Sequence, residues 1–140
     1  MKILGIDFGT RRTGLAFADS RDGLIFARRP LHISNRTALA GALADLVKEE
    51  AVEVAVFGLP GNKEDHETEI CRRVRNVAAD MATLAPVKVC FVDERLTSFE
   101  AASRLRQGGL KGRRLTAAID SEAAVLILEF FLKNNMEPEI

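Results

Sequence analysis

Three acidic residues that lie far apart in the sequence have positions that favour a shared metal site. Asp7 ends an apolar run that begins at Lys2, and Glu94 follows a later apolar run that begins at Val87. In open sheets with parallel strands, sites form outside the carboxyl ends of the strands, so we expect both carboxylates at one edge. Asp120, in a helical pattern, supplies a third. Carboxylate oxygens without thiols or imidazoles suit Mg²⁺ or Mn²⁺.

The helical position of Asp120 is unfavourable for a carboxylate that has no cation beside it. Asp120 shares a helical face with Ala123, Ala124, Ile127 and Phe131, which must pack on the sheet. Burial of a charge there costs free energy unless a cation compensates. Such locally unfavourable positions are often functional.

Each carboxylate also has a structural interpretation. Asp7 could cap the turn that follows it, and Glu94 could pair with a neighbouring arginine. Asp120 could be favoured by the dipole at a helix N-terminus. A single carboxylate would leave the two interpretations equally supported, whereas three that converge on one edge favour the metal site.

The elements that would position these residues follow an α/β order. Three apolar runs separated by short turn signals predict antiparallel hairpin strands, and right-handed crossovers would make two later strands parallel to the first. The predicted strands are residues 2–8, 13–18, 24–33 (interrupted at Arg28, Arg29 and Pro30), 52–59 and 87–92. Four helices are predicted. The first follows an N-cap at Ser34 and reaches Glu50, and the second has an apolar inner face between Ile70 and Met81. The third covers Thr97 to Gln107, and the last covers about 117–134.

This order predicts a five-stranded mixed sheet, with three antiparallel strands and then two parallel strands, and helices on both faces. Residues 1–136 are expected to form a single domain, and residues 137–140 a loose tail. At 140 residues the chain can bury one core, but not two lobes with a cleft between them.

The composition is that of an ordinary folded domain. Hydrophobic residues make up 47% and charged residues 29% of the chain. No apolar stretch is long enough to span a membrane, and the first residues run into a strand rather than a signal peptide, so we expect no membrane association and a cytoplasmic location. Cys71 and Cys90 have no cysteine or histidine at ligand spacing, and we interpret both as small buried hydrophobic residues.

Charge and aromatic content restrict how the chain could bind a polyanion. The 20 basic and 20 acidic residues cancel, so any nucleic-acid site must be a local patch. The chain has no Trp or Tyr, and its eight Phe fall mostly in core patterns, so a base-stacking platform is not expected. We interpret Arg72, Arg73 and Arg75 as a solvated helix face. The candidate contacts to the nucleic-acid backbone are Thr10, Arg11, Arg12 and Arg95, together with Lys111, Arg113 and Arg114 of a basic loop.

Four motifs in the same order resemble the YqgF family over about residues 2–133. They are Gly5-Ile6-Asp7-Phe8-Gly9-Thr10 with Gly14, then Gly58-Leu59-Pro60, then Asp93-Glu94-Arg95-Leu96-Thr97-Ser98 with Glu100-Ala101, and Asp120-Ser121-Glu122-Ala123-Ala124. Members of this family are described as Holliday-junction resolvases and as nucleases that mature the 5′ end of pre-16S ribosomal RNA. The resemblance implies a ribonuclease-H-like fold in which Asp7, Glu94 and Asp120 are the acidic triad. The loop at residues 61–66 departs from the family pattern, which leaves its substrate contacts and any role of His66 open.

The resulting hypothesis is a metal-dependent endonuclease that acts on structured nucleic acid. Two ions would activate a water and stabilise the leaving 3′ oxygen. Asp7 would bridge both ions, Glu94 and Asp120 would each hold one, and Asp93 would replace Glu94 if strand alternation points Glu94 away. Processing of the 5′ end of pre-16S ribosomal RNA is the favoured activity, and resolution of four-way DNA junctions is the alternative.

Two further interpretations compete with a nuclease. The first is a nucleic-acid-binding protein that keeps the fold without cleaving. The second is an ATP-binding module of the actin-like type, because Gly5 to Thr10 also resembles the first phosphate loop of those proteins. Actin-like proteins bind ATP between two duplicated lobes, and the length of this chain argues against that architecture.

Overall fold

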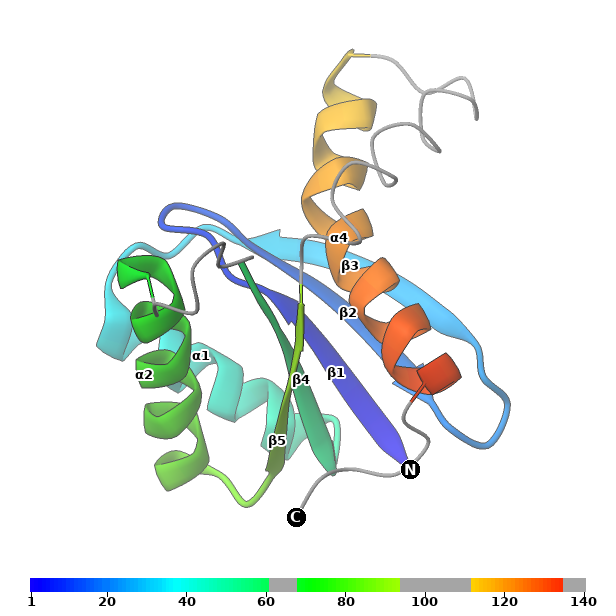
Figure 1. Cartoon of the computed structure of the whole chain (residues 1–140), viewed down its shortest axis with the longest axis horizontal. Coiled ribbons are helices and arrows are strands. Elements are labelled where there is room, and N and C mark those ends of the chain that lie inside the picture. Colours follow the sequence, from blue (N-terminus) through cyan, green and yellow to red (C-terminus); the bar gives the residue numbers. More distant parts are fainter. Residues whose placement is uncertain (61–67, 94–111, 135–140) are drawn as a thin grey trace.

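The computed structural model describes residues 1–60, 68–93 and 112–134, with only the helix backbone described for residues 112–120. The predicted helix over residues 97–107, the loop at 61–66 and the tail at 137–140 lie outside the described residues. Figure 1 shows the arrangement of the elements. Their bounds are β1 Lys2–Asp7, β2 Thr13–Asp19, β3 Ile25–Leu31, α1 Arg36–Glu49, β4 Val54–Leu59, α2 Glu69–Leu84, β5 Lys88–Asp93 and α4 Gly112–Asn134.

The five strands form one sheet in the order β3-β2-β1-β4-β5. The pairs β1–β2 and β2–β3 are antiparallel, whereas β1–β4 and β4–β5 are parallel. This confirms the predicted mixed sheet. The central strand is β1, and the carboxyl ends of β1, β4 and β5 lie at the same edge of the sheet.

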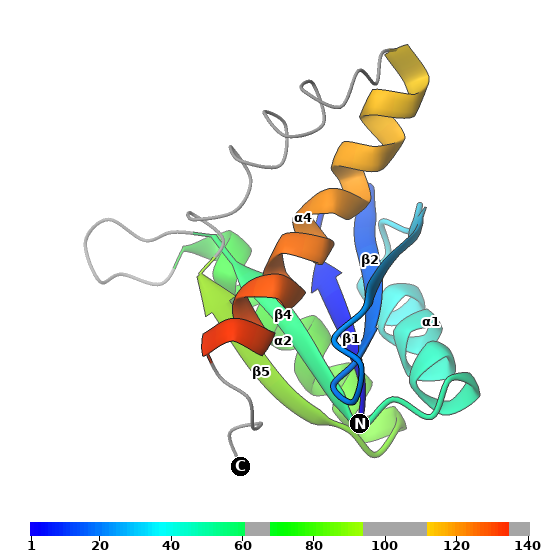
Figure 2. The same ribbon diagram turned by 90° about the vertical axis from the view of Figure 1, so that its right-hand side faces the viewer.

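Helices cover both faces of the sheet, as predicted: α1 and α2 lie on one face and α4 on the other (Figures 1 and 2). Side chains of a strand alternate between the two faces. In β1, Leu4 and Ile6 belong to the core beneath α1 and α2, and Ile3 belongs to the core beneath α4. The odd positions of β1 therefore face α4, and Asp7 is the last of them.

The two helices on the first face are each capped and are tied together by an ion pair. The side chain of Asn35 caps α1 and that of Thr68 caps α2. The predicted N-cap at Ser34 is therefore wrong by one residue; the side-chain oxygen of Asn35 accepts the amide three residues on, which is the usual capping bond. Arg36 of α1 pairs with Asp80 of α2 at 2.6 Å.

Strand β3 runs through the residues that were expected to interrupt it. Arg28, Arg29 and Pro30 all belong to it. The pairing shifts there: Thr13 pairs with Leu31 and Leu15 with Arg28, so three steps along β3 oppose two along β2. An edge strand tolerates a proline and a bulge because its outer side has no ladder partner to lose.

Helix α4 begins at Gly112, about five residues before the expected start. Arg113 and Arg114 therefore lie in a helix rather than in the predicted basic loop. Arginine and leucine are good helix formers, and they follow Gly112 directly. Cys71 and Cys90 are buried and free, which confirms their interpretation as small hydrophobic residues. Among the described residues, no helix is long and apolar enough to cross a membrane.

Candidate functional site

Asp7 ends the central strand on the face that α4 covers. It pairs across the antiparallel ladder with Gly14 and is partly buried. In the parallel pairing of β1 with β4, Ile6 is level with Phe57, so Asp7 is level with the next residue, Gly58. Gly58 in turn is level with Val92 of β5. Gly58 contributes no side chain between β1 and β5. The predicted metal ligand Asp7 thus lies at the carboxyl edge of the sheet, where sites form in open sheets.

Gly5 brings α4 close to the strand that carries Asp7. A Cβ atom on Gly5 would lie 2.6 Å from Cγ of Leu128 and 2.9 Å from the carbonyl oxygen of Ala124. Any larger residue at position 5 would push the helix away from β1. The helix that contains Asp120 therefore packs against β1 at a position two residues before Asp7.

The turn between β1 and β2 exposes three of the predicted nucleic-acid contacts next to Asp7. Thr10, Arg11 and Arg12 are all exposed. A Cβ atom on Gly9 would lie 2.0 Å from the carbonyl oxygen of Arg12, so only glycine allows the chain to close the turn this tightly. The conformation of this turn therefore depends on Gly9.

The side chains of β5 alternate between the two faces of the sheet, and this shows whether Asp93 lies on the same face as Asp7. Cys90 and Val92 belong to the core beneath α4. Phe91 lies on the other face, where its ring centroid is 6.1 Å from that of Phe57, and the guanidinium of Arg75 in α2 is 4.9 Å from it. Alternation puts Asp93 on the same face as Phe91. This argues against Asp93 as a partner of Asp7.

The remaining predicted site residues are described in part or not at all. Among the described side chains, which do not include those of Glu94 and Asp120, no group of three His, Cys, Asp or Glu could hold a metal ion. Outside the described residues lie Glu94, Arg95 and Lys111. The structure describes only the helix backbone of three further residues, which lie in α4: Asp120, Arg113 and Arg114.

Ser121 is a buried polar residue next to Asp120 to which the sequence pattern assigned no role. Its side chain is 3% exposed, and its Oγ donates a hydrogen bond to the backbone carbonyl of Arg28 in β3. The only other buried polar side chain in the described part of the chain is Thr13, whose hydroxyl has no hydrogen-bond partner. A serine in a helical pattern gives no sequence signal of a partner 93 positions away.

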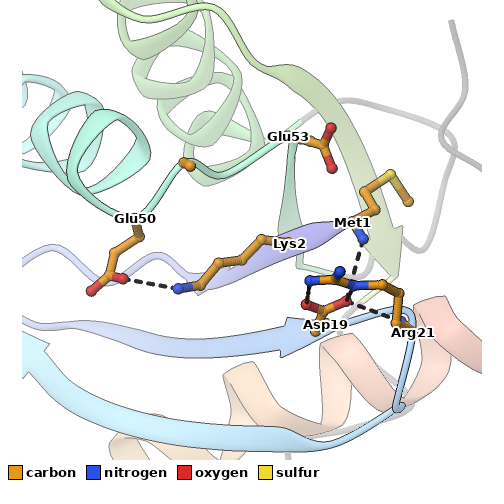
Figure 3. Close-up of a pocket in the computed structure, with 7 residues that line it drawn as sticks. Met1, Lys2, Asp19, Arg21, Glu50 and Glu53 are labelled. Atoms are coloured by element: carbon orange, nitrogen blue, oxygen red, sulfur yellow. Dashed lines mark hydrogen bonds and ion pairs between the residues drawn. The ribbon is translucent and has the colours of Figure 1, made fainter.

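A pocket of about 380 Å³ lies at the start of β1, at the opposite end of the strand from Asp7 (Figure 3). Acidic and basic side chains neutralise one another there: Arg21 pairs with Asp19 at 3.0 Å and Lys2 with Glu50 at 2.8 Å. The hydrogen bond from Arg21 holds the pKa of Asp19 well below its usual range. The hydrogen bond from Lys2 likewise lowers the pKa of Glu50. Such a paired set of charges is suited to joining elements rather than to binding a polyanion.

Solved structures with the same fold include two resolvases. RuvC of Thermus thermophilus in complex with a Holliday junction substrate matches with a TM-score of 0.55 at 12% identity, covering 100% of this chain and 99% of that one. The fowlpox virus Holliday junction resolvase matches with a TM-score of 0.55 at 12% identity, covering 93% of this chain and 99% of that one. At this identity the matches establish the ribonuclease-H-like fold that the sequence predicted, and only the fold.

Comparisons of the sequence identify closer relatives. A protein of Nitratidesulfovibrio vulgaris (strain DP4) is 43% identical over 132 residues, which cover 94% of this chain and 93% of the relative. One of Oleidesulfovibrio alaskensis is 45% identical over 132 residues, which cover 94% and 92%. Both are named as candidate pre-16S rRNA nucleases. A family model described as "RuvX: Holliday junction resolvase" matches residues 1–134. The chain therefore belongs to the RuvX family, which confirms the resemblance that its four motifs carry.

Proposed function

We propose that the chain is a metal-dependent endonuclease that hydrolyses phosphodiester bonds in structured nucleic acid. The observation that carries the proposal is the position of Asp7, at the carboxyl end of the central strand and on the face covered by the helix that contains Asp120. Gly5 supports it, because its missing side chain brings that helix against β1 two residues before Asp7. Membership of the RuvX family and relatives named as nucleases favour hydrolysis over binding alone.

The proposed metal ligands are Asp7, Glu94 and Asp120. The chemistry of Asp7 fits a hard divalent cation, because its carboxylate offers oxygen ligands and it is partly buried at the edge of the sheet. When bound, Mg²⁺ or Mn²⁺ ions would make water a better nucleophile and would stabilise the leaving oxygen. The strand alternation of β5 favours Glu94 over Asp93 as the second ligand.

The proposed grip on the nucleic acid comes from basic residues around the same edge. Thr10, with the backbone amides of the β1–β2 turn, would position a phosphate, and Arg11 and Arg12 would neutralise its neighbours. Arg95, Lys111, Arg113 and Arg114 are proposed to extend this surface. Contacts of this kind orient the substrate but do not read its bases.

Processing of pre-16S ribosomal RNA is the favoured activity, because the relatives that are 43% and 45% identical over most of their length carry that name. Resolution of a four-way DNA junction is the second candidate, favoured by the description of the matching family. Both reactions cleave the same phosphodiester linkage, so one acidic site serves either. An actin-like ATP-binding role is disfavoured by the family match over residues 1–134.

The test offers the purified protein a pre-16S ribosomal RNA precursor and a four-way DNA junction with Mn²⁺, and the cuts are mapped. We expect cleavage that stops in excess chelator and in Asp7→Asn, while circular dichroism shows that the variant is folded. Asp45→Asn is the matched control, because Asp45 is an exposed carboxylate on α1. Full activity of folded Asp7→Asn, or of the wild type in chelator, would overturn the proposed site. Binding of both nucleic acids without cleavage under any metal would favour the non-catalytic interpretation.

A further inference from the structure

The buried hydroxyl of Ser121 links two segments that are remote in the sequence. Its Oγ donates to the carbonyl of Arg28, and the side chain is 3% exposed. A buried hydrogen bond to a backbone carbonyl has a fixed length and direction, unlike the apolar contacts around it. The bond therefore fixes where this turn of α4 sits on β3.

The acceptor lies at the irregular part of β3. The pairing of β3 with β2 shifts between Arg28, which pairs with Leu15, and Leu31, which pairs with Thr13. Bulged segments bend a strand locally, and they often lie next to active sites, where they redirect a residue. Ser121 thus bonds the carbonyl at the inner border of the bulge.

A second contact holds α4 on another strand, one turn further along the helix. Ala124 and Leu128 lie directly over Gly5 of β1. The apolar residues of α4, such as Ile127 and Phe131, also pack on the sheet, and the hydrogen bond to β3 adds a directional contact at the turn that follows Asp120. In Figures 1 and 2 the later turns of α4 cover the sheet, and its first turns project past the edge of the sheet.

We propose that Ser121 is a positioning residue for Asp120, the residue that precedes it in α4. The hydrogen bond to Arg28 fixes the turn that carries Asp120 relative to the end of β1, where Asp7 lies. This inference rests on the proposed function, in which both carboxylates hold metal. The competing explanation is that Ser121 only stabilises the packing of α4.

The test compares Ser121→Ala with Ile127→Val. Ile127 is a fully buried residue of the same helix, and shortening it weakens the packing of α4 without touching the hydrogen bond. Ser121→Thr is the conservative variant, because it keeps the hydroxyl. For all three we would measure melting temperature, Mn²⁺ affinity by calorimetry, kcat and KM on the nucleic acid that the wild type cleaves, and amide hydrogen exchange over residues 113–120.

If Ser121 positions Asp120, Ser121→Ala lowers kcat by roughly tenfold with KM nearly unchanged, since misplacement of one ligand affects the reaction more than substrate binding. Its Mn²⁺ affinity falls, and amides 113–120 exchange faster. Ile127→Val, at a similar loss of melting temperature, changes none of these, and Ser121→Thr restores them. Equal behaviour of Ser121→Ala and Ile127→Val would overturn the inference and leave Ser121 a packing residue.

Failure of the proposed function would give a different result. In that case the wild type itself neither cleaves nor binds Mn²⁺. The hydrogen-exchange comparison would then still decide whether the bond fixes the start of α4: faster exchange over residues 113–120 in Ser121→Ala alone supports a fixed start, and equal exchange in both variants refutes it.

Discussion

Replacing Gly5 by alanine tests how closely α4 must approach the strand that carries Asp7. The added Cβ would lie 2.6 Å from Cγ and 3.1 Å from Cδ1 of Leu128, and 2.9 Å from the carbonyl oxygen of Ala124. Leu128 is fully buried and Cγ is not the free end of its side chain, and the carbonyl belongs to the helix backbone, so neither contact is relieved without a shift of the helix. Ordinary contact begins at 3.4 Å, so relief of the clash with the carbonyl oxygen requires the helix to move by at least about 0.5 Å.

The expected loss of stability is moderate. Overpacking of a core costs about 1–3 kcal/mol, and alanine regains roughly 0.5–1 kcal/mol relative to glycine within a strand. The net cost is about 1–2 kcal/mol, or a fall in melting temperature of roughly 4–8 °C for a chain of this size. The expected loss of activity is larger. A shift of 0.5 Å reaches the tolerance of roughly 0.5 Å within which catalytic groups must be held. We therefore expect a fall in kcat on the order of tenfold.

The assay measures melting temperature and single-turnover cleavage for Gly5→Ala and for Gly41→Ala. Gly41 lies in α1, and a Cβ atom there would meet nothing within 4 Å. That control should melt higher than the wild type, because alanine favours helix by about 1 kcal/mol, and its activity should be unchanged. A Gly5→Ala variant that melts like the wild type would refute the packing argument. One that melts lower but cleaves at the normal rate would refute the link between the position of α4 and catalysis.

Two further predictions concern the loop beside the site and the tie between α1 and α2. Gly9→Ala should lower the cleavage rate strongly and the melting temperature only slightly. A Cβ atom 2.0 Å from the carbonyl oxygen of Arg12 forces the β1–β2 turn, which carries the proposed phosphate contacts, into another conformation. Equal cleavage rates of wild type and variant would contradict this. The hydrogen bond from Arg36 lowers the pKa of Asp80, so this pair stabilises the fold above the ordinary carboxyl pKa and loses its contribution as the pH falls from about 5 toward 2. Asp80→Asn should therefore show a shallower decline of melting temperature over that range than the wild type, whereas Asp45→Asn, at an exposed carboxylate of α1, should follow the wild type.

Most of the strands could be predicted from sequence because they carry a clear apolar signal. Strand β4 is a continuous buried run, and β1 and β2 are compact apolar runs with turn signals between them. The edge strand β3 is different. Its exposed residues Arg28 and Arg29, followed by Pro30, resemble an interruption, because only the tertiary position of an edge strand makes them acceptable. Phe26, also on β3, is 64% exposed, although phenylalanines were expected mainly in the core.

The chemistry of the candidate site could be predicted from sequence, but the contacts that position its residues could not. Asp7 was found because it ends an apolar run, and its position at the carboxyl edge agrees with that expectation. The contacts that hold α4 in place could not be found in this way. Gly5 resembles any glycine of a strand, and Ser121 resembles any polar residue of a helix. Their importance arises from distances to residues more than 90 positions away, which no local pattern contains.

The alternation of side chains between the two faces of the sheet indicates whether Asp93 or Glu94 is the second carboxylate of the site. In β1 the odd positions face α4, and in β5 the even positions do, as Val92 shows. Val92 is paired with Gly58, which is level with Asp7, so Val92 is the position of β5 in the same row and on the same face as Asp7. Neighbouring strands are about 4.8 Å apart, so Asp7 and Val92 are separated by roughly 10 Å across β4, with only the backbone of Gly58 between them. Asp93 lies on the opposite face, so Glu94 rather than Asp93 is the proposed partner of Asp7.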